Sequence, residues 1–244
     1  MELALHLGDF SLGNDNRGEK TSTLGNLVYR HIRVQMLGGN LLPGTKLTLR
    51  AVAESLEVSQ QPVREAINRL IAEAVLEAAS SRVVQVPVLS REALDELWAL
   101  RIMLEGEVAA AFARNASDEH RAALDKASDD LINLTFKTKS DELVSTYNWV
   151  AHMGAGCKYP ALVSLAMNIR LRTTPHVAEA LDRPDPDART FFQFSRHIMH
   201  ELNCAIQARD VSRARHLRCA DAATYQRHIY ERLGWSAPRN DLGF

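Results

Sequence analysis

The side chains with the clearest capacity for recognition chemistry lie between Leu47 and Leu70, where polar and cationic residues alternate with apolar ones at helical spacing. Arg donates paired hydrogen bonds to guanine, Asn and Gln pair with adenine, and all of them can also contact phosphates. The residues concerned are Gln60, Gln61, Arg64, Asn68 and Arg69. On a helix that a DNA-binding motif presents to a groove, these side chains could read base edges. On a helix without such a motif they would simply be solvated.

Two short helices are expected to position these side chains. Apolar residues recur at spacings of three and four between Leu49 and Leu56, which predicts a first helix. A short turn then leads to Ser59, a good N-cap for a second helix whose first turn tolerates Pro62. The inward positions of the second helix are Val63, Ile67 and Leu70. Two such helices, with the second polar on its outer face, form the helix-turn-helix arrangement.

The same stretch resembles a known family. Residues 42–47 (LPGTKL), 50–56 (RAVAESL) and 58–70 (VSQQPVREAINRL) are similar to the winged-helix domain of GntR-family bacterial repressors. The run PVREA in the third segment is far more specific to that family than a generic helix-turn-helix would be. The remainder of the chain looks like the helical ligand domain (FCD domain) of the FadR-type subfamily. The resemblance therefore covers most of the chain.

The resemblance implies DNA contacts for particular residues. Arg50 and Arg64 match positions that contact bases or phosphates, and the residues from Ser59 onward begin the helix that enters the groove. Relatives commonly carry Arg at the position of Gln60, so a changed operator is expected. Their wing tip usually bears a glycine, and here Arg82 could enter the minor groove instead. The expected DNA-contacting residues are Arg50, Ser59, Gln60, Gln61, Arg64, Arg69 and Arg82.

The remaining pattern predicts a mainly α chain with two domains. Residues 21–88 are expected to form a winged helix-turn-helix domain with a β-hairpin wing, and residues 89–235 an all-α bundle of six to seven helices for ligand binding and dimerisation. Residues 1–20 and 236–244 are interpreted as tails. The expected bundle helices span residues 90–115, 117–137, 140–155, 160–180, 187–208 and 210–232.

Composition limits the possible classes of protein. The formal net charge is −1, so overall charge does not indicate a nucleic-acid partner. No apolar run approaches a membrane span, and the N-terminus lacks the pattern of a signal peptide. Three cysteines at uneven spacings form no zinc motif, which favours a reducing, cytoplasmic location. There is no nucleophile paired with a base and no Gly-rich phosphate loop, so we expect no enzyme activity.

Arg101 begins an Arg-x-x-Leu-Glu signature that ends at Glu105 and matches the ligand domain of the family. Arg101 could therefore face the bundle interior and bind a carboxylate through its guanidinium fork. The alternative is a pair with Glu105 along the same helix. One of Arg170 and Arg172 could reach the ligand pocket, although we expect both to be solvated or paired with surface acids.

Many relatives hold a metal in the bundle through an Asp-x-x-x-His pair and two further His residues. The matching ligand-site positions here are Asn148, His152, Met199 and Asp221. Two alternatives follow from this altered set. His152, His200 and Asp221 could form a rearranged site for Mn, Ni or Zn. Otherwise the metal has been lost and these side chains bind an organic ligand directly.

Together these features predict a homodimeric transcriptional regulator that binds a palindromic operator in double-stranded DNA. The resemblance implies a repressor that a small organic acid relieves by shifting the protein between two states. Two other classes stay open: a constitutive DNA-binding dimer with a vestigial pocket, and a metal-dependent enzyme built on the bundle. No membrane partner is expected.

Overall fold

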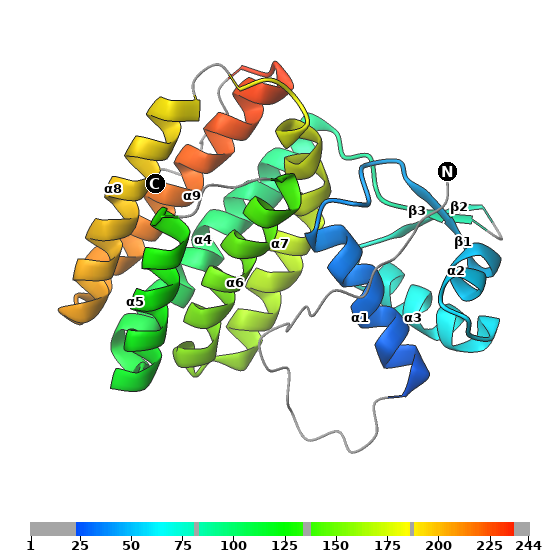
Figure 1. Cartoon of the computed structure of the whole chain (residues 1–244), viewed down its shortest axis with the longest axis horizontal. Coiled ribbons are helices and arrows are strands. Elements are labelled where there is room, and N and C mark those ends of the chain that lie inside the picture. Colours follow the sequence, from blue (N-terminus) through cyan, green and yellow to red (C-terminus); the bar gives the residue numbers. More distant parts are fainter. Residues whose placement is uncertain (1–22, 81–82, 134–137, 186–187, 237–244) are drawn as a thin grey trace.

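The computed structural model describes residues 23–80, 83–133, 138–185 and 188–236 of the 244 in the chain. Figure 1 shows two parts side by side: three helices with a small sheet, and a bundle of longer helices. Within these residues the fold is mainly α, as predicted. The described segments include no helix with the length and apolarity needed to span a membrane.

The first part contains the predicted helix-turn-helix. Its helices are α1 (Leu24–Leu37), α2 (Leu49–Ser55) and α3 (Gln60–Ala72). Thr23 and Thr48 cap α1 and α2 by accepting hydrogen bonds from backbone N–H groups. Glu57 turns the chain between α2 and α3 in the left-handed region, at φ 53°. Ser59 occupies the N-cap position of α3, as predicted, but its side chain makes no capping hydrogen bond.

The wing belongs to a three-stranded antiparallel sheet in the order β1-β3-β2, rather than to a simple hairpin. Its strands are β1 (Lys46–Thr48), β2 (Glu77–Ser80) and β3 (Val83–Gln85). The β2–β3 pairing confirms the predicted hairpin, with an irregularity between Ala78 and Ser80. The sequence prediction missed β1, because three residues are too few to show strand alternation.

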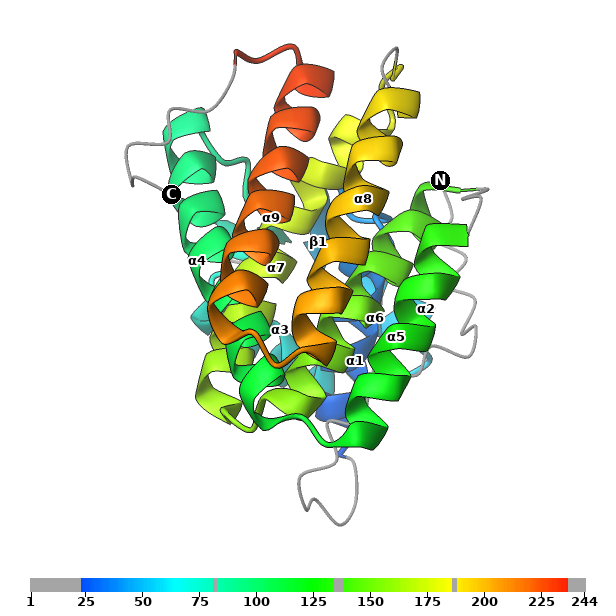
Figure 2. The ribbon, with the colours of Figure 1, turned by 90° about the vertical axis from the view of Figure 1, so that its left-hand side faces the viewer.

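The second part is a bundle of six helices within the described residues. They are α4 (Arg91–Asn115), α5 (Asp118–Asn133), α6 (Lys139–Cys157), α7 (Pro160–Leu181), α8 (Ala188–Gln207) and α9 (Val211–Leu233). Ser90 and Asp210 cap α4 and α9, and Thr138 forms a capping box with Asp141 at the start of α6. Helix α4 is central and packs against α6, α7 and α9, while Figure 2 shows α8 lying between α9 and α5.

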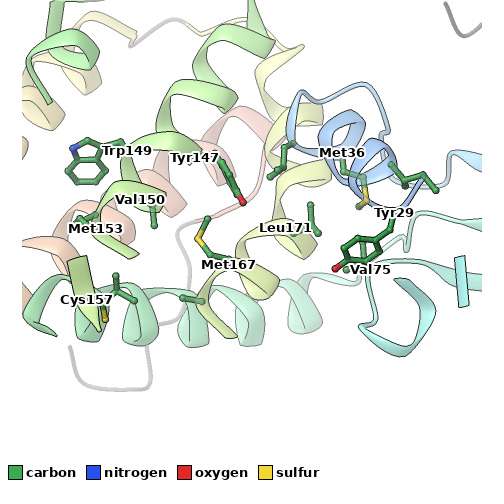
Figure 3. Close-up of a cluster of buried hydrophobic side chains, with 14 of the residues drawn as sticks. Tyr29, Met36, Val75, Tyr147, Trp149, Val150, Met153, Cys157, Met167 and Leu171 are labelled. Carbon is green, nitrogen blue, oxygen red and sulfur yellow. The ribbon is translucent and has the colours of Figure 1, made fainter. Parts of the chain in front are cut away.

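One hydrophobic cluster runs through both parts of the molecule. Figure 3 shows it extending from Tyr29 and Met36 of α1 to Met167 and Leu171 of α7. Polar contacts accompany the packing, because Asn168 Nδ2 donates to the backbone oxygen of Glu73, at the end of α3, over 3.2 Å. The DNA-reading helix therefore rests, through its own C-terminal end, on a helix of the bundle.

Gly39 permits the close approach of the two parts. Its φ is +74°, and a Cβ there would lie 2.7 Å from Leu143 Cδ1 and 3.0 Å from Ala178 Cβ. We therefore expect Gly39→Ala to lower the free energy of unfolding by more than about 1 kcal/mol, measured by urea titration. Gly234→Ala is the matched control, because Gly234 has φ +76° but no described atom within 4 Å of such a Cβ. Equal losses in both variants would show that backbone strain alone matters.

Candidate functional site

The first candidate site is the outer surface at the start of α3. Gln60, Gln61 and Arg64 are all exposed there, as predicted for side chains that enter a groove. Ser59 leaves its hydroxyl uncommitted at the N-terminus of the helix. The unpaired N–H groups and dipole of a helix N-terminus favour an anion such as a phosphate. The surface thus combines base-reading amides and a cation with a place for a backbone phosphate.

The other predicted cations have different surroundings. Arg50 is exposed on α2 and pairs with Glu54 over 2.7 Å. Arg69 lies on α3, but its guanidinium is 3.8 Å from the centre of the Tyr29 ring and its Nε is 3.1 Å from a Glu73 carboxylate oxygen. These contacts hold the Arg69 side chain against its own domain, although 52% of it stays exposed, and its DNA contact stays a prediction. Arg82 lies outside the described residues.

The second candidate site is an ionic cluster inside the bundle. Glu105 on α4 has no exposed surface and accepts hydrogen bonds from three arginines. Arg101 Nε lies 3.0 Å and Arg170 Nη1 2.9 Å from Glu105 Oε1, while Arg218 pairs with the other oxygen. Arg218 also pairs with Asp221, one turn further along α9. Helices α4, α7 and α9 thus meet at a single carboxylate.

The charges in this cluster shift one another's protonation. Burial by itself would raise the pKa of Glu105, but Arg218, Arg101 and Arg170 hold it well below its usual range. Burial, followed by the nearby charge of Arg170, lowers the pKa of Arg101 to about 10, so Arg101 stays charged at neutral pH. Burial raises the pKa of Asp221 in spite of its pair with Arg218. Glu105 is therefore the permanent anion of the cluster.

A cavity of about 80 Å³ opens beside these charges. The polar side chains at its surface include the three arginines, Asp221, Glu142 and Tyr225. Burial raises the pKa of Glu142 to about 7, and Tyr225 donates a hydrogen bond to it over 3.3 Å. Apolar side chains complete the wall, namely Leu131, Trp149, Val150, Phe191, Met199 and Ala222. Charged groups beside an apolar wall are typical of a site for a small amphipathic molecule.

The predicted ligand residues divide into two groups. Arg101, Met199 and Asp221 line the cavity. Arg101 also pairs with Glu105, which was the alternative prediction. Facing the bundle interior and pairing along the helix are therefore compatible. Asn148 and His152 are not among the described residues at the cavity, and His152 is exposed. Helix α6 instead turns Glu142, Thr146, Trp149 and Val150 toward the cavity, so the structure does not bring Asn148 and His152 together with the other predicted ligand residues.

The predicted metal set is not brought together either. His152 and His200 are exposed, and His200 Nε2 lies 3.7 Å from Cys204 Sγ on its own helix. Asp221 is instead engaged with Arg218. In the described part of the chain, no three His, Cys, Asp or Glu side chains are grouped so that they could hold a metal ion. The residues present therefore do not fit the metal-ligand set that the sequence suggested.

Of the cavity arginines, sequence reasoning did not favour Arg170 and missed Arg218. Arg170 was expected at the surface, whereas only 5% of it is exposed. Arg218 was not among the predicted site residues, although only 4% of it is exposed. Its guanidinium carbon lies 5.3 Å from the centre of the Trp149 ring. A usable signal was the run of polar residues at Arg170, Thr173 and Thr174, at spacings of three and four along one face of α7. Such a run indicates a buried polar network when it lies on the inward face.

Comparisons with known proteins place the first site in a family. The model of "Bacterial regulatory proteins, gntR family" matches residues 24–86. The HTH-type transcriptional regulator McbR of Escherichia coli K12 is 25% identical over 195 residues, which cover 78% of this chain and 85% of McbR.

Solved structures agree on the fold. The structure of E. coli McbR aligns with a TM-score of 0.78 at 22% identity, covering 87% of this chain and all of that one (100%). A protein from Rhodococcus sp. RHA1 described as a GntR transcriptional regulator aligns with a TM-score of 0.64 at 18% identity, covering 87% of this chain and 99% of that one. Both alignments include the helical bundle, so the two-part architecture is shared.

Removal of the central carboxylate should destabilise the bundle strongly. In Glu105→Gln three buried guanidinium groups lose their common anion, and we expect the free energy of unfolding to fall by about 3–5 kcal/mol. Urea titration measures the change. Glu107→Gln is the matched control on the same helix, because the Glu107 side chain is 46% exposed and forms its ion pair with one arginine, Arg215, among the described residues. A loss in Glu105→Gln no larger than in the control would contradict the central role of Glu105.

Proposed function

From the premise that residues 24–86 are a DNA-binding helix-turn-helix domain of the gntR family of bacterial regulatory proteins, we propose a function for the whole chain. A small organic acid that binds in the bundle cavity controls operator binding by this transcriptional regulator. The observation that carries the proposal is that one helix both lines the cavity and contacts the DNA-reading helix α3. Helix α7 presents Arg170 to the cavity and, two residues earlier, Asn168 to the end of α3.

In this proposal the start of α3 reads the operator. Arg64 contacts guanine, or a phosphate beside it, while Gln60 and Gln61 contact neighbouring base edges. Arg50 on α2 contacts the phosphate backbone. These side chains are exposed, and the Gln61 amide is held by Glu65 over 3.2 Å. Gln60, where relatives commonly have Arg, makes the operator differ from theirs.

The cavity receives the effector. Its wall combines buried arginines with apolar side chains, which suits a carboxylate on a short hydrocarbon body. The predicted residues Arg101, Met199 and Asp221 remain part of this site, and Arg170 and Arg218 join them. An effector that changes the ion pairs of Glu105 would move α7 relative to α4 and α9, because Glu105 connects the three helices.

Movement of α7 would reach the DNA through its contacts with the first domain. The cluster that joins α1 to α7 is tightly buried, and packed interfaces change between discrete arrangements rather than deform gradually. The effector therefore favours one arrangement of the two domains, which is population shift. We propose a repressor released by its effector, acting as a homodimer whose two-fold axis matches a palindromic operator.

Operator reading by Arg64 can be tested directly. We expect Arg64→Ala to weaken binding to sites that the wild-type protein selects from random DNA by about 1–3 kcal/mol, because a bidentate base contact is lost. Gel-shift titration at fixed salt measures the change. Arg114→Ala is the control, since it removes one exposed cation from the far end of α4. Unchanged affinity in Arg64→Ala would refute the assignment.

The contact between Asn168 and Glu73 should carry part of the coupling. In Asn168→Ala the end of α3 loses its hydrogen bond to α7, so the change in operator affinity caused by an effector should shrink several-fold. The measurement is operator affinity with and without each acid of a panel of short-chain monocarboxylates. Asn115→Ala is the matched control, because Asn115 also donates one hydrogen bond to a backbone oxygen, that of Cys157, away from α3 and the cavity. The same response in Asn168→Ala and wild type would exclude this route.

A further inference from the structure

The buried charges around the cavity do not cancel. Arg101, Arg170 and Arg218 supply three positive charges, while Glu105 and Asp221 supply two negative ones. Four of these side chains are at most 6% exposed and Asp221 is 14% exposed, so water screens them little. An uncompensated buried charge is costly. The cluster is therefore short of one negative charge.

Glu142 does not supply that charge below neutral pH. Burial raises its pKa to about 7, so at pH 6 most of the carboxyl groups at this position are neutral. Its partner in the wall is the Tyr225 hydroxyl, which is also neutral. On the α8 side Arg196 also lines the cavity, but its side chain is exposed, so water screens its charge. The cavity as a whole therefore favours a ligand with a single negative charge.

Arg218 offers the atom to which such a ligand would bind. Its two terminal nitrogens are paired, Nη1 with Asp221 and Nη2 with Glu105. The third donor, Nε, is buried and has no hydrogen-bond partner among the described residues. A buried donor without an acceptor costs about 1–3 kcal/mol. Arg218 lines the cavity, so a carboxylate bound there would supply the missing charge, and it would satisfy this N–H once the side chain turns the donor toward the cavity.

The size of the cavity limits the body of the ligand. Its volume of about 80 Å³ is clearly smaller than the roughly 150 Å³ of an apolar cavity that admits benzene. The enclosed volume therefore suits an aliphatic chain of roughly three to five carbons better than an aromatic ring. The walls that would contact the chain are Leu131, Val150, Met199 and Ala222.

We propose that the cavity binds a short aliphatic monocarboxylate directly on Arg218, with Asp221 acting as the internal anion that weakens the binding. This inference rests on the proposed effector role of the cavity and names the effector's chemical class. Asp221 competes because it draws on the same guanidinium charge as the ligand. In a metal site, by contrast, Asp221 would hold the ligand in place, and its loss would weaken binding.

The test uses isothermal titration calorimetry on the full chain after treatment with a chelator, at pH 6. The probes are butyrate, its neutral analogue butyramide, the dianion succinate, and benzoate. We expect butyrate to bind once per chain and each of the other three to bind at least ten-fold more weakly. Butyramide binding as tightly as butyrate would overturn the charge argument, and benzoate binding more tightly would overturn the size argument. Absence of butyrate binding would overturn the proposal as a whole.

The decisive variant is Asp221→Asn. Removal of the competing anion should tighten butyrate binding at least ten-fold, whereas weaker binding would overturn the role given to Asp221. Asp125→Asn is the matched control, because Asp125 is exposed on α5 and contacts Asn203 instead. Should Asp221→Asn fail to fold, Ala222→Val tests whether butyrate binds in this cavity. Its two added methyl groups project from the cavity wall, so butyrate binding should be abolished while the fold is kept. Unchanged binding in Ala222→Val would place the acid elsewhere.

Operator titrations in parallel separate this inference from the proposed function. If butyrate binds as expected but never alters operator affinity, the ligand class stands and the regulatory role fails. If operator affinity responds to a different class of molecule while butyrate does not bind, the regulatory role stands and the ligand class fails.

Discussion

The carboxylate of Glu105 lies at the centre of the bundle, where α4, α7 and α9 each bring an arginine to it. A charge buried to this degree must be paired, since an isolated one would cost several kcal/mol. The three helices must therefore hold relative positions that keep the pairs intact. The same requirement prevents apolar side chains from closing the interior, and a cavity remains beside the arginines. The geometry of the bundle and the cavity beside the arginines thus share one electrostatic cause.

Arginine serves different purposes in the two parts of the molecule because burial differs. Arg64 is exposed on α3 and available to DNA, whereas Arg69, on the same helix, is stacked on Tyr29 and paired with Glu73. In the bundle, Arg218 is buried and keeps one donor without a partner in the described structure. An exposed arginine gains affinity from a polyanion, while a buried one selects a ligand of matching charge.

Helix α7 connects these two kinds of site. Its buried face carries Arg170 toward Glu105, and Met167 and Leu171 toward the cluster shared with α1. Asn168 adds a hydrogen bond to the end of α3. No part of this arrangement requires a flexible linker to transmit a change, because the two domains share one packed interior. A shift of α7 at the cavity would alter the support of the DNA-reading helix directly.

Local sequence information was sufficient for the helices and for the outward face of the DNA-reading helix. Apolar periodicity and the breaks between segments located the helices to within a few residues, because these signals act over a single turn. The inward faces of α6 and α7 could not be found in this way. Trp149 rather than His152 faces the cavity, and Arg170 is buried, because packing against helices distant in the chain sets the rotation of each helix. A charge can lie inside only where such packing brings its partners to it, and no local pattern records those partners.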